Sequence, residues 1–297
     1  ITMPFSHFLF ALLVVIIWGV NFLFVKFALT EISPLLLCAL RFILASVPAI
    51  FFIKRPAIPF RIVVLYGLVM FALQFSFMFM GMYVGMTPGM ASLIMQTQVF
   101  FSMFFAVVLL GEQPSPWQIV GAFVSFIGIG LVAMHFDQNV SVLGFLFILG
   151  AAATWGVGNL ITKKTAKINM ISLVVWGSFV ASWPLLISSL LFEGTASLAY
   201  TYYHLSWVGT FSLCYIVYAS TWVGYGLWNW LLSRYPIGAV VPFTLLVPVV
   251  GVLSSVLILD EPFYPWKIAS GLLVIAGLGI NLLGPRLFMK KIQPEMG

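Results

Sequence analysis

Ten apolar runs follow one another along this chain, and they restrict its fold more than any other feature. Each is close to the roughly 20 residues that a membrane-spanning helix needs. Lipid offers no hydrogen bonds to the backbone, so runs of this length are satisfied as helices. The sequence therefore predicts an all-α membrane protein with ten transmembrane helices. The predicted spans are 7–28, 34–53, 62–84, 89–110, 116–134, 142–162, 171–192, 207–232, 237–259 and 265–284.

The composition agrees with this fold class. Hydrophobic residues make up 63% of the chain and charged residues 7%, whereas soluble proteins carry about 25% charged residues. The net charge of +6 lies in short loops between the apolar runs, not in a basic patch interleaved with aromatic side chains. A lipid bilayer is therefore the expected partner, and nucleic acid is not.

The positive charges also predict the orientation. Cytoplasmic loops of membrane proteins are enriched in Lys and Arg. Basic residues follow the second, sixth, eighth and tenth spans, whereas the opposite side holds only Lys26 and Lys267. Both termini are therefore predicted to be cytoplasmic. The residues on that side are Lys54, Arg55, Arg61, Lys163, Lys164, Lys167, Arg234, Arg286, Lys290 and Lys291.

The two halves of the chain resemble each other. The run WGVN at 18–21 resembles WGVGN at 155–159, and GEQPSPWQI from Gly111 aligns with DEPFYPWKI from Asp260. Each half holds five predicted spans, so the second must insert upside down relative to the first. Inverted repeats of this kind bind substrate between the halves, near the membrane midplane. The predicted domains are a first repeat at 7–134, a second at 142–284 and a basic cytoplasmic tail at 285–297.

Glycines mark two further spans. The span at 116–134 carries Gly121, Gly128 and Gly130, and the span at 265–284 carries glycines at 271, 277 and 279, with few polar residues in either. Small residues allow helices to approach closely. These two spans are predicted to be close-packed outer or interface helices.

The order and spacing of these motifs resemble the EamA-type branch of the drug/metabolite transporter superfamily, over essentially the whole chain. Within that branch, ALRFILASVPAIFF from Ala39 and GMASLIMQTQVFFSMF from Gly89 are similar to bacterial exporters of amino-acid metabolites such as O-acetylserine and cysteine. The resemblance implies an inner-membrane, multi-pass exporter of small amino-acid-like metabolites that works by alternating access. It also implies a central cavity bounded by the spans at 7–28, 62–84, 89–110, 142–162, 207–232 and 237–259.

Polar side chains in the span at 89–110 are candidates for substrate binding. At about 100° per residue, Ser92 and Gln96 share a face, while Gln98 points about 200° away from Gln96. One of these faces can line a cavity while the other bonds neighbouring helices. An amide donates and accepts hydrogen bonds, which suits a zwitterion. We predict that Ser92 and Gln96 bind substrate and that Gln98 is structural or gating; interhelical bonding by both glutamines is the alternative.

The other substrate-binding candidates are amide or aromatic side chains on spans that bound the expected cavity. The amides would hold polar ends of a substrate, and the aromatic rings would close around its apolar part. Packing between the repeats, or a place in an aromatic belt, is the alternative for each. The candidates are Trp18, Asn21, Gln74, Trp155, Asn159, Tyr225 and Trp228.

Arg41 is unusual because it lies seven residues inside the span at 34–53, and Gly177 takes its place in the second repeat. A cation at this depth snorkels to the interface, pairs with a carboxylate or binds an anionic group of a substrate. The resemblance favours a structural or gating role over direct binding.

The acidic residues restrict the coupling mechanism. All seven fall at helix ends, in loops or in the tail, so no carboxylate is expected to be buried in the membrane. Release of a cationic drug in exchange for protons normally needs such a group. We therefore expect coupling to the substrate gradient or to titrating groups of the substrate itself. The residues are Glu31, Glu112, Asp137, Glu193, Asp260, Glu261 and Glu295.

Other function classes receive less support. Neither the cysteines, Cys38 and Cys214, nor the three histidines have metal-ligand spacing, and no nucleotide motif occurs, so no metal, cofactor or enzymatic activity is expected. A membrane scaffold would need large soluble loops, and the longest is at 193–206. A broad exporter of aromatic or drug-like compounds is the alternative within the transporter class. A small-molecule substrate and a monomer or weak homodimer are expected.

Overall fold

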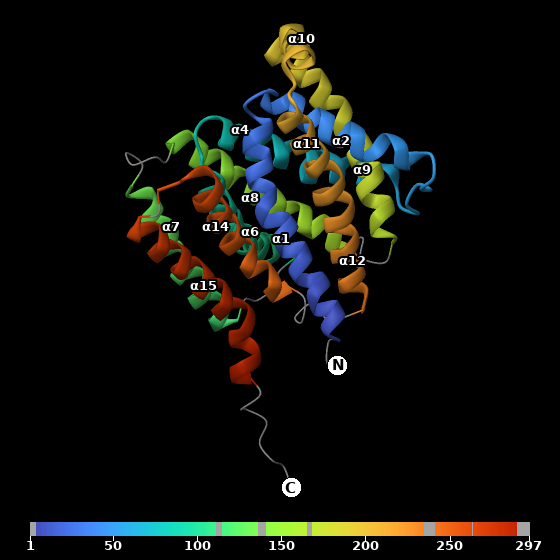
Figure 1. Cartoon of the computed structure of the whole chain (residues 1–297). Coiled ribbons are helices and arrows are strands. Elements are labelled where there is room, and N and C mark those ends of the chain that lie inside the picture. Colours follow the sequence, from blue (N-terminus) through green and yellow to red (C-terminus); the bar gives the residue numbers. More distant parts are fainter. Residues whose placement is uncertain are drawn as a thin grey trace.

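The described part of the chain is helical throughout and forms a bundle (Figure 1). The computed structural model describes residues 4–110, 115–135, 141–164, 168–234, 241–262 and 264–289. In the first half the elements are α1 (Phe5–Ala28), α2 (Pro34–Ile50), α3 (Phe60–Tyr66), η1 (Gly67–Leu73), α4 (Gln74–Tyr83), α5 (Pro88–Ile94), η2 (Met95–Thr97), α6 (Gln98–Leu110) and α7 (Pro116–Ala133). In the second half they are α8 (Val142–Lys164), α9 (Met170–Ser188), η3 (Ser189–Glu193), α10 (Gly194–His204), α11 (Trp207–Cys214), η4 (Tyr215–Gly224), α12 (Tyr225–Arg234), η5 (Val241–Leu246), α14 (Val247–Leu259) and α15 (Pro265–Met289).

Each predicted apolar run coincides with a helix or with a series of helical segments, but several runs change helix type midway. The segments η1, η3 and η4 are π-helical, and η2 and η5 are 3₁₀-helical. π-Helical segments have a wider turn than the α-helix and occur frequently at functional sites, whereas 3₁₀ turns are tighter. Three of these segments, η2, η4 and η5, border the cavity described below.

Three helical stretches within the described residues are long and apolar enough to cross a membrane: Phe5–Ala28, Phe60–Tyr83 and Met170–His204. The shorter apolar helices there have 10–17 residues, so ten spans and their orientation remain predictions. Large apolar side chains such as Phe104, Phe123 and Leu272 are exposed on the outside of the bundle. An apolar outer surface of this kind suits a lipid environment.

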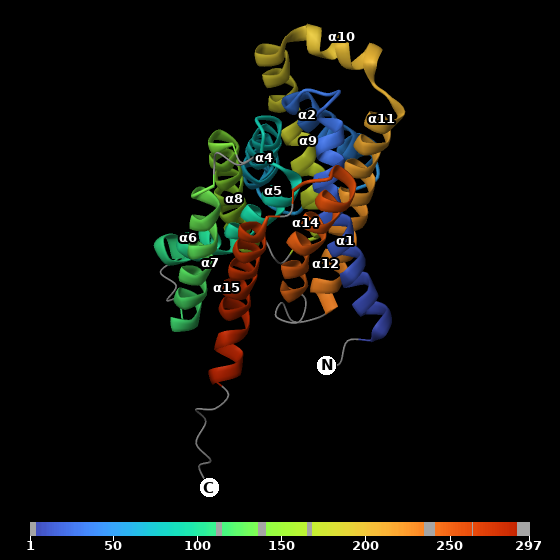
Figure 2. The ribbon, with the colours of Figure 1, turned by 60° about the vertical axis from the view of Figure 1, so that its left-hand side comes forward.

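The first and last helices begin and end on the same side of the bundle. In Figures 1 and 2, α1 rises from the lower side, and α15 descends to it. The segments that join α1 to α2 and α14 to α15 lie on the upper side, where α10 forms the top. The helix α15 continues to Met289, beyond the predicted boundary at 284. Glu112, Asp137 and the tail from residue 290 lie outside the described residues.

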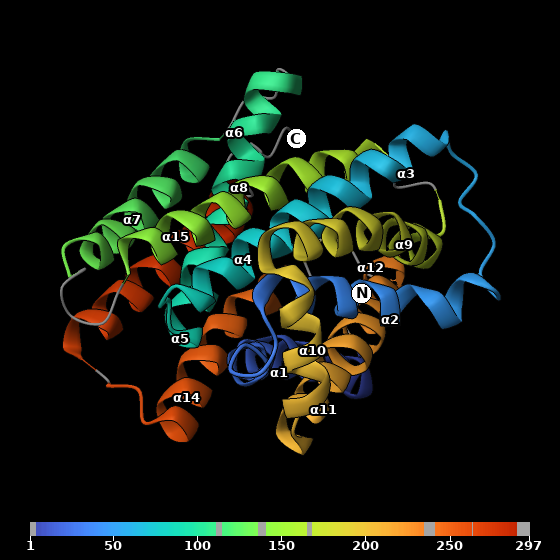
Figure 3. The ribbon, with the colours of Figure 1, turned by 90° about the horizontal axis from the view of Figure 1, so that it is seen from above.

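The prediction that the two glycine-rich spans are close-packed helices is confirmed, and the structure shows that they pack against each other. The helices α7 and α15 lie side by side (Figures 1 and 3) and contact each other. A Cβ atom on Gly128 would lie 2.9 Å from Leu273 Cβ, so only glycine fits there. Ser270 Oγ donates to Gly128 O at 2.7 Å, and Ser125 Oγ donates to Val274 O at 3.2 Å. Small residues bring these helices close enough for hydroxyls to reach the facing backbone.

On the upper side, three glutamates connect helices; we call this region, defined by Glu31, Glu193 and Glu261, the acidic end. Glu193 accepts hydrogen bonds from the backbone N–H groups of Leu35 and Leu36 at 2.8 and 3.0 Å. Two serine hydroxyls, at positions 33 and 189, donate to it at 2.6 and 2.8 Å. Its carboxylate therefore caps the N-terminus of α2, where the helix dipole favours a negative charge.

Glu31 acts in the same way on α11. It accepts hydrogen bonds from Ser206 N at 2.8 Å and Ser206 Oγ at 2.6 Å, directly before that helix begins. Its backbone carbonyl accepts a hydrogen bond from Thr201 Oγ1 at 3.3 Å. The turn after α1 is thereby tied to both α10 and α11.

Glu261, the third glutamate of the acidic end, is buried within the protein. It lies at a helix end, between α14 and α15, but its side chain is only 8% exposed and that of Lys267 only 4%. Lys267 Nζ and Thr87 Oγ1 each donate to Oε1 at 2.7 Å, and Ser255 Oγ donates to Oε2. The ion pair and the hydroxyls satisfy the charge, which explains how the carboxylate tolerates burial.

Candidate functional site

A cavity of about 90 Å³ lies among the helices of both halves. We call it the central cavity. Its lining comes from α1, α4, η2, α6, α8, η4, α12, η5 and α14, in agreement with the spans that the resemblance implies, and from α2 in addition. The lining residues are Trp18, Asn21, Phe22, Arg41, Phe75, Met78, Met95, Gln96, Gln98, Trp155, Ser220, Tyr225, Thr244 and Val247.

Asn21 supplies an acceptor to the central cavity. It lies one turn after Trp18 on α1 and is 5% exposed. Its Oδ1 atom has no hydrogen-bond donor. Buried polar atoms in proteins are nearly always hydrogen-bonded, so an unpaired oxygen that borders a cavity marks a place for a ligand or for water.

Arg41 supplies a positive charge to the same cavity. It is 2% exposed, so it does not snorkel to the surface. Its Nη2 atom donates to Thr221 Oγ1 at 3.1 Å, while Nε and Nη1 have no acceptor. The guanidinium carbon lies 4.1 Å from the ring centroid of Phe75 and 5.6 Å from that of Phe42. The rings stabilise the charge from the side, but part of the hydrogen-bonding edge of the guanidinium is left unused.

The π-helical segment η4 places the partner of Arg41. Thr221 Oγ1 donates to Ile216 O, five residues earlier, at 3.0 Å. Its hydroxyl hydrogen is therefore committed to the backbone, and a lone pair faces the guanidinium. In the same segment, Ser220 O accepts a hydrogen bond from Trp18 Nε1 at 3.2 Å, which ties η4 to α1.

The two glutamines differ from the predicted arrangement, because Gln96 and Gln98 both line the central cavity. The prediction assumed an α-helix, in which these residues point to nearly opposite sides. Residues Met95–Thr97 instead form a 3₁₀ turn, which advances about 120° per residue rather than about 100°. The two amides are thus brought nearer to one side, and the separate structural role predicted for Gln98 loses its geometric basis.

Aromatic side chains close one side of the cavity. The ring centroids of Tyr225 and Trp228 each lie 5.4 Å from that of Trp18. Tyr225 and Trp18 line the cavity, whereas Trp228 packs behind them. Trp155 lines the cavity from α8, in the second repeat. The predicted pairing of the WGVN and WGVGN tryptophans around one cavity therefore agrees with the geometry.

Besides Trp228, two predicted site residues, Ser92 and Gln74, do not line the cavity. Ser92 is fully buried, donates to Gly89 O at 2.7 Å and packs against Gly251 of α14, so it belongs to a helix contact. Gln74 is 1% exposed, and neither polar atom of its amide has a partner, but it does not line the cavity. The side chain of Asn159 lies outside the described residues.

Several lining residues were missed by the sequence analysis. Most are apolar, and an apolar residue on a transmembrane helix looks the same whether it faces a cavity, a neighbouring helix or lipid. Phe75 is the one apolar residue among them that could have been considered, as an aromatic partner for the Arg41 guanidinium. The missed residues are Phe22, Phe75, Met78, Met95, Ser220, Thr244 and Val247.

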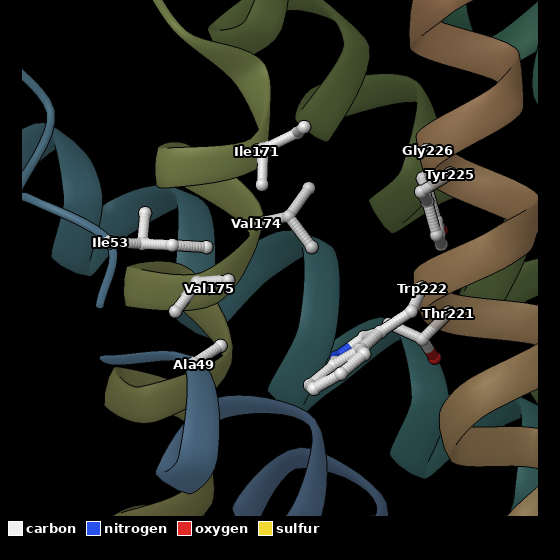
Figure 4. A pocket seen from close by; sticks show the side chains of 9 residues that line it. All are labelled: Ala49, Ile53, Ile171, Val174, Val175, Thr221, Trp222, Tyr225 and Gly226. Carbon is white, nitrogen blue, oxygen red and sulfur yellow. The ribbon is translucent and has the colours of Figure 1, made fainter. Parts of the chain in front are cut away.

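A second, apolar pocket of about 220 Å³ adjoins the central cavity, and Tyr225 lines both. Figure 4 shows the residues of α2 and α9 on one side of this pocket and those of η4 and α12 on the other. Trp222 extends across the space between the two sides, and its Nε1 atom donates to Ala45 O at 3.0 Å. The lining residues are Ala49, Ile53, Ile171, Val174, Val175, Thr221, Trp222, Tyr225 and Gly226.

Comparisons with known proteins agree with this geometry. The model of the EamA-like transporter family matches residues 6–134 and 142–283. A protein of Escherichia coli (strain K12), named probable amino-acid metabolite efflux pump, is 37% identical over 283 residues, which cover 93% of this chain and 94% of that protein. Its namesake in Salmonella typhimurium (strain LT2) is 38% identical over 282 residues, with the same coverage. A crystal structure with 18% identity has the same fold, with a TM-score of 0.59 over 96% of this chain and 100% of its own.

Proposed function

We propose, on the premise that this chain belongs to the EamA-like transporter family, that it exports small amino-acid-like metabolites across a bacterial inner membrane. The observation that carries the proposal is the central cavity, where amide and guanidinium groups lie within an otherwise apolar bundle. In a membrane protein, polar groups at such a place mark a substrate pathway. The names of the two relatives support the substrate class.

The proposed architecture has ten spans in two inverted five-helix repeats, with both termini in the cytoplasm. Two features support it: the family match falls into two segments, and α1 begins on the side of the bundle where α15 ends. In this orientation the acidic end faces the periplasm. The apolar pocket, lined by Ile53 and Ile171 near cytoplasmic loops, faces the cytoplasm. Transport then requires the two sides to open alternately around the central cavity.

Within that cavity, we assign the polar ends of the substrate to Asn21, Gln96 and Gln98. The rings of Trp18, Trp155 and Tyr225 close around its apolar part. Energy comes from the substrate gradient or from titrating groups of the substrate. The protein acts as a monomer or weak homodimer, without a cofactor.

Counterflow in proteoliposomes tests this function. Vesicles that contain the reconstituted protein are loaded with unlabelled cysteine, O-acetylserine or threonine and then exposed to the same compound in labelled form. We expect accumulation of at least one of the three above that in protein-free vesicles. A labelled cationic dye serves as the comparison, and movement of the dye alone, or of no compound, would refute the proposal.

The apolar pocket favours a second candidate substrate class. Its volume exceeds that of the central cavity, and its lining is mostly aliphatic and aromatic. A broad exporter of aromatic or drug-like compounds would use such a surface. Against this, the central cavity of about 90 Å³ is well below the roughly 300–1,000 Å³ of sites for drug-sized ligands. Small metabolites are therefore the better fit.

A further inference from the structure

Arg41 carries a buried positive charge that lacks a counter-ion. Within the part of the chain that the structure describes, no Asp or Glu lines the central cavity. Lys267 and Glu261 form an ion pair at the acidic end, and neither residue lines the cavity. An unpaired charge in a membrane protein interior is unfavourable and is retained where it has a function. Of the three roles open to an arginine at this depth, snorkelling is excluded by its burial, and no carboxylate among the described residues pairs with it.

The contacts of the guanidinium leave its donors available to a ligand. The rings of Phe75 and Phe42 interact with the charge, and such contacts use no hydrogen-bond donor. A guanidinium has five N–H donors, which match the two oxygens of a carboxylate. Thr221 takes a donor of Nη2, and those of Nε and Nη1 remain without an acceptor.

Asn21 offers the complementary group in the same cavity. Its Oδ1 atom is an acceptor without a donor, whereas Arg41 has donors without acceptors. A solute with a carboxylate and an ammonium group would satisfy both, and a solute with one of them would leave the other unpaired. A buried polar group left unpaired is the usual basis of strong discrimination between similar ligands.

We propose that Arg41 binds the carboxylate of the transported metabolite and Asn21 its ammonium group, so that the central cavity selects zwitterions with a free carboxylate. This inference rests on the proposed export function and gives it a substrate class. It also assigns Arg41 a direct binding role, whereas the family resemblance implies a structural or gating one. Amines that lack the carboxylate, and esters that mask it, are excluded because they leave the guanidinium unpaired.

Competition in the wild-type protein tests the selectivity without any mutation. Labelled cysteine is the counterflow probe, under reducing conditions, and the competitors are unlabelled cysteine, cysteamine and cysteine methyl ester. Cysteamine lacks the carboxylate, and the ester masks it. We expect each to compete roughly tenfold more weakly than cysteine, the loss expected for one charge-assisted contact. Equal competition by cysteamine would overturn the assignment of Arg41, whereas no counterflow of any amino acid would refute the export function instead.

A pair of variants identifies the residue. Arg41→Met removes the charge and keeps the length of the side chain, and Arg41→Lys keeps the charge but loses the planar fork. We expect Arg41→Met to lower cysteine counterflow roughly tenfold and to abolish the preference over cysteamine, with an intermediate result for Arg41→Lys. The double variant Lys267→Met/Glu261→Gln is the matched control, because it removes a buried cation outside the cavity together with its counter-ion and should keep the preference. If Arg41→Met keeps the preference for cysteine, the proposal is wrong.

Discussion

The acidic end and the central cavity differ in whether their buried polar groups have partners within the protein. At the acidic end, Glu193 accepts hydrogen bonds from two backbone N–H groups and two hydroxyls, and Glu261 is paired with Lys267. In the central cavity, two nitrogens of Arg41 and Oδ1 of Asn21 have no partner. The first region satisfies its charges within the protein, whereas the second leaves part of its hydrogen-bonding capacity unused.

This difference separates two roles for polar residues in a membrane protein. A charge whose partners come from neighbouring helices holds those helices together, so loss of a partner weakens the fold. A charge that has no counter-ion and leaves some of its hydrogen-bond donors unused contributes less to the fold, and those donors are available for recognition. Substitutions at the acidic end should therefore change stability first, and substitutions in the central cavity should change transport first.

The largest effect is expected for Lys267→Met. This change leaves the Glu261 carboxylate buried without its counter-ion, which costs about 3–5 kcal/mol when a buried pair is broken. The measurement is the midpoint of thermal unfolding in detergent. The double variant Lys267→Met/Glu261→Gln should recover part of the loss, because the amide carries no charge. An unchanged midpoint in the single variant would show that the pair does not hold α14 and α15 together.

Arg41→Met is the corresponding variant in the central cavity. We expect it to lower transport but to change stability little. Removal of an unpaired buried charge is expected to leave the unfolding free energy within about 1 kcal/mol of the wild type. Counterflow should fall roughly tenfold in the same preparation, because the substrate loses a charge-assisted contact. A large drop in the unfolding midpoint would instead assign Arg41 to the fold and remove the contrast between the two regions.

Glu193→Gln should produce a smaller loss of stability. The amide keeps the shape of the side chain but is neutral. It replaces the carboxylate whose oxygens accept hydrogen bonds from Leu35 N and Leu36 N. A hydrogen bond to a charged group contributes about 1.5–3 kcal/mol, of which the neutral amide should retain part. Hydrogen exchange of these two amides should accelerate, while amides in the middle of α2 serve as the internal control. Unchanged exchange would mean that Glu193 does not cap the helix.

The smallest effects concern the polar residues of the span at 89–110. Gln96→Ala and Gln98→Ala should each lower counterflow by roughly two- to tenfold, because each removes a neutral hydrogen-bonding group from the cavity. Ser92→Ala is the matched control, and it should leave counterflow unchanged because Ser92 faces Gly251 rather than the cavity. A loss confined to Gln96→Ala would favour an α-helical arrangement of this segment over the 3₁₀ turn.

Much of the fold could be predicted because its signals are local. The length of an apolar run predicts a helix, and glycines such as those at 128 and 277 predict that α7 and α15 are close-packed, since a close approach requires small side chains. The resemblance between WGVN and WGVGN likewise indicated that Trp18 and Trp155 face one cavity. Each of these inferences needs only the residues of one helix or of two matching helices.

The candidate site was predictable only in part. Gln96 and Gln98 were expected on nearly opposite faces, but both line the cavity because the helix type changes at Met95–Thr97. No residue in that segment indicates a 3₁₀ turn. Ser92 has the composition of a site residue but packs against Gly251. Met78 and Val247 could not be identified because apolar side chains carry no chemical sign of facing a cavity.

The sequence by itself determined the fold class, the family and the presence of one unusual cation. It showed that Arg41 lies deep in an apolar run, but it could not distinguish snorkelling, an ion pair and substrate binding. Only the tertiary structure showed that Arg41 is buried rather than snorkelling and which groups contact it, because its partners come from other helices: Phe75 from α4 and Thr221 from η4. Whether a buried charge is satisfied depends on which helices pack around it, and the sequence of a single helix does not determine that.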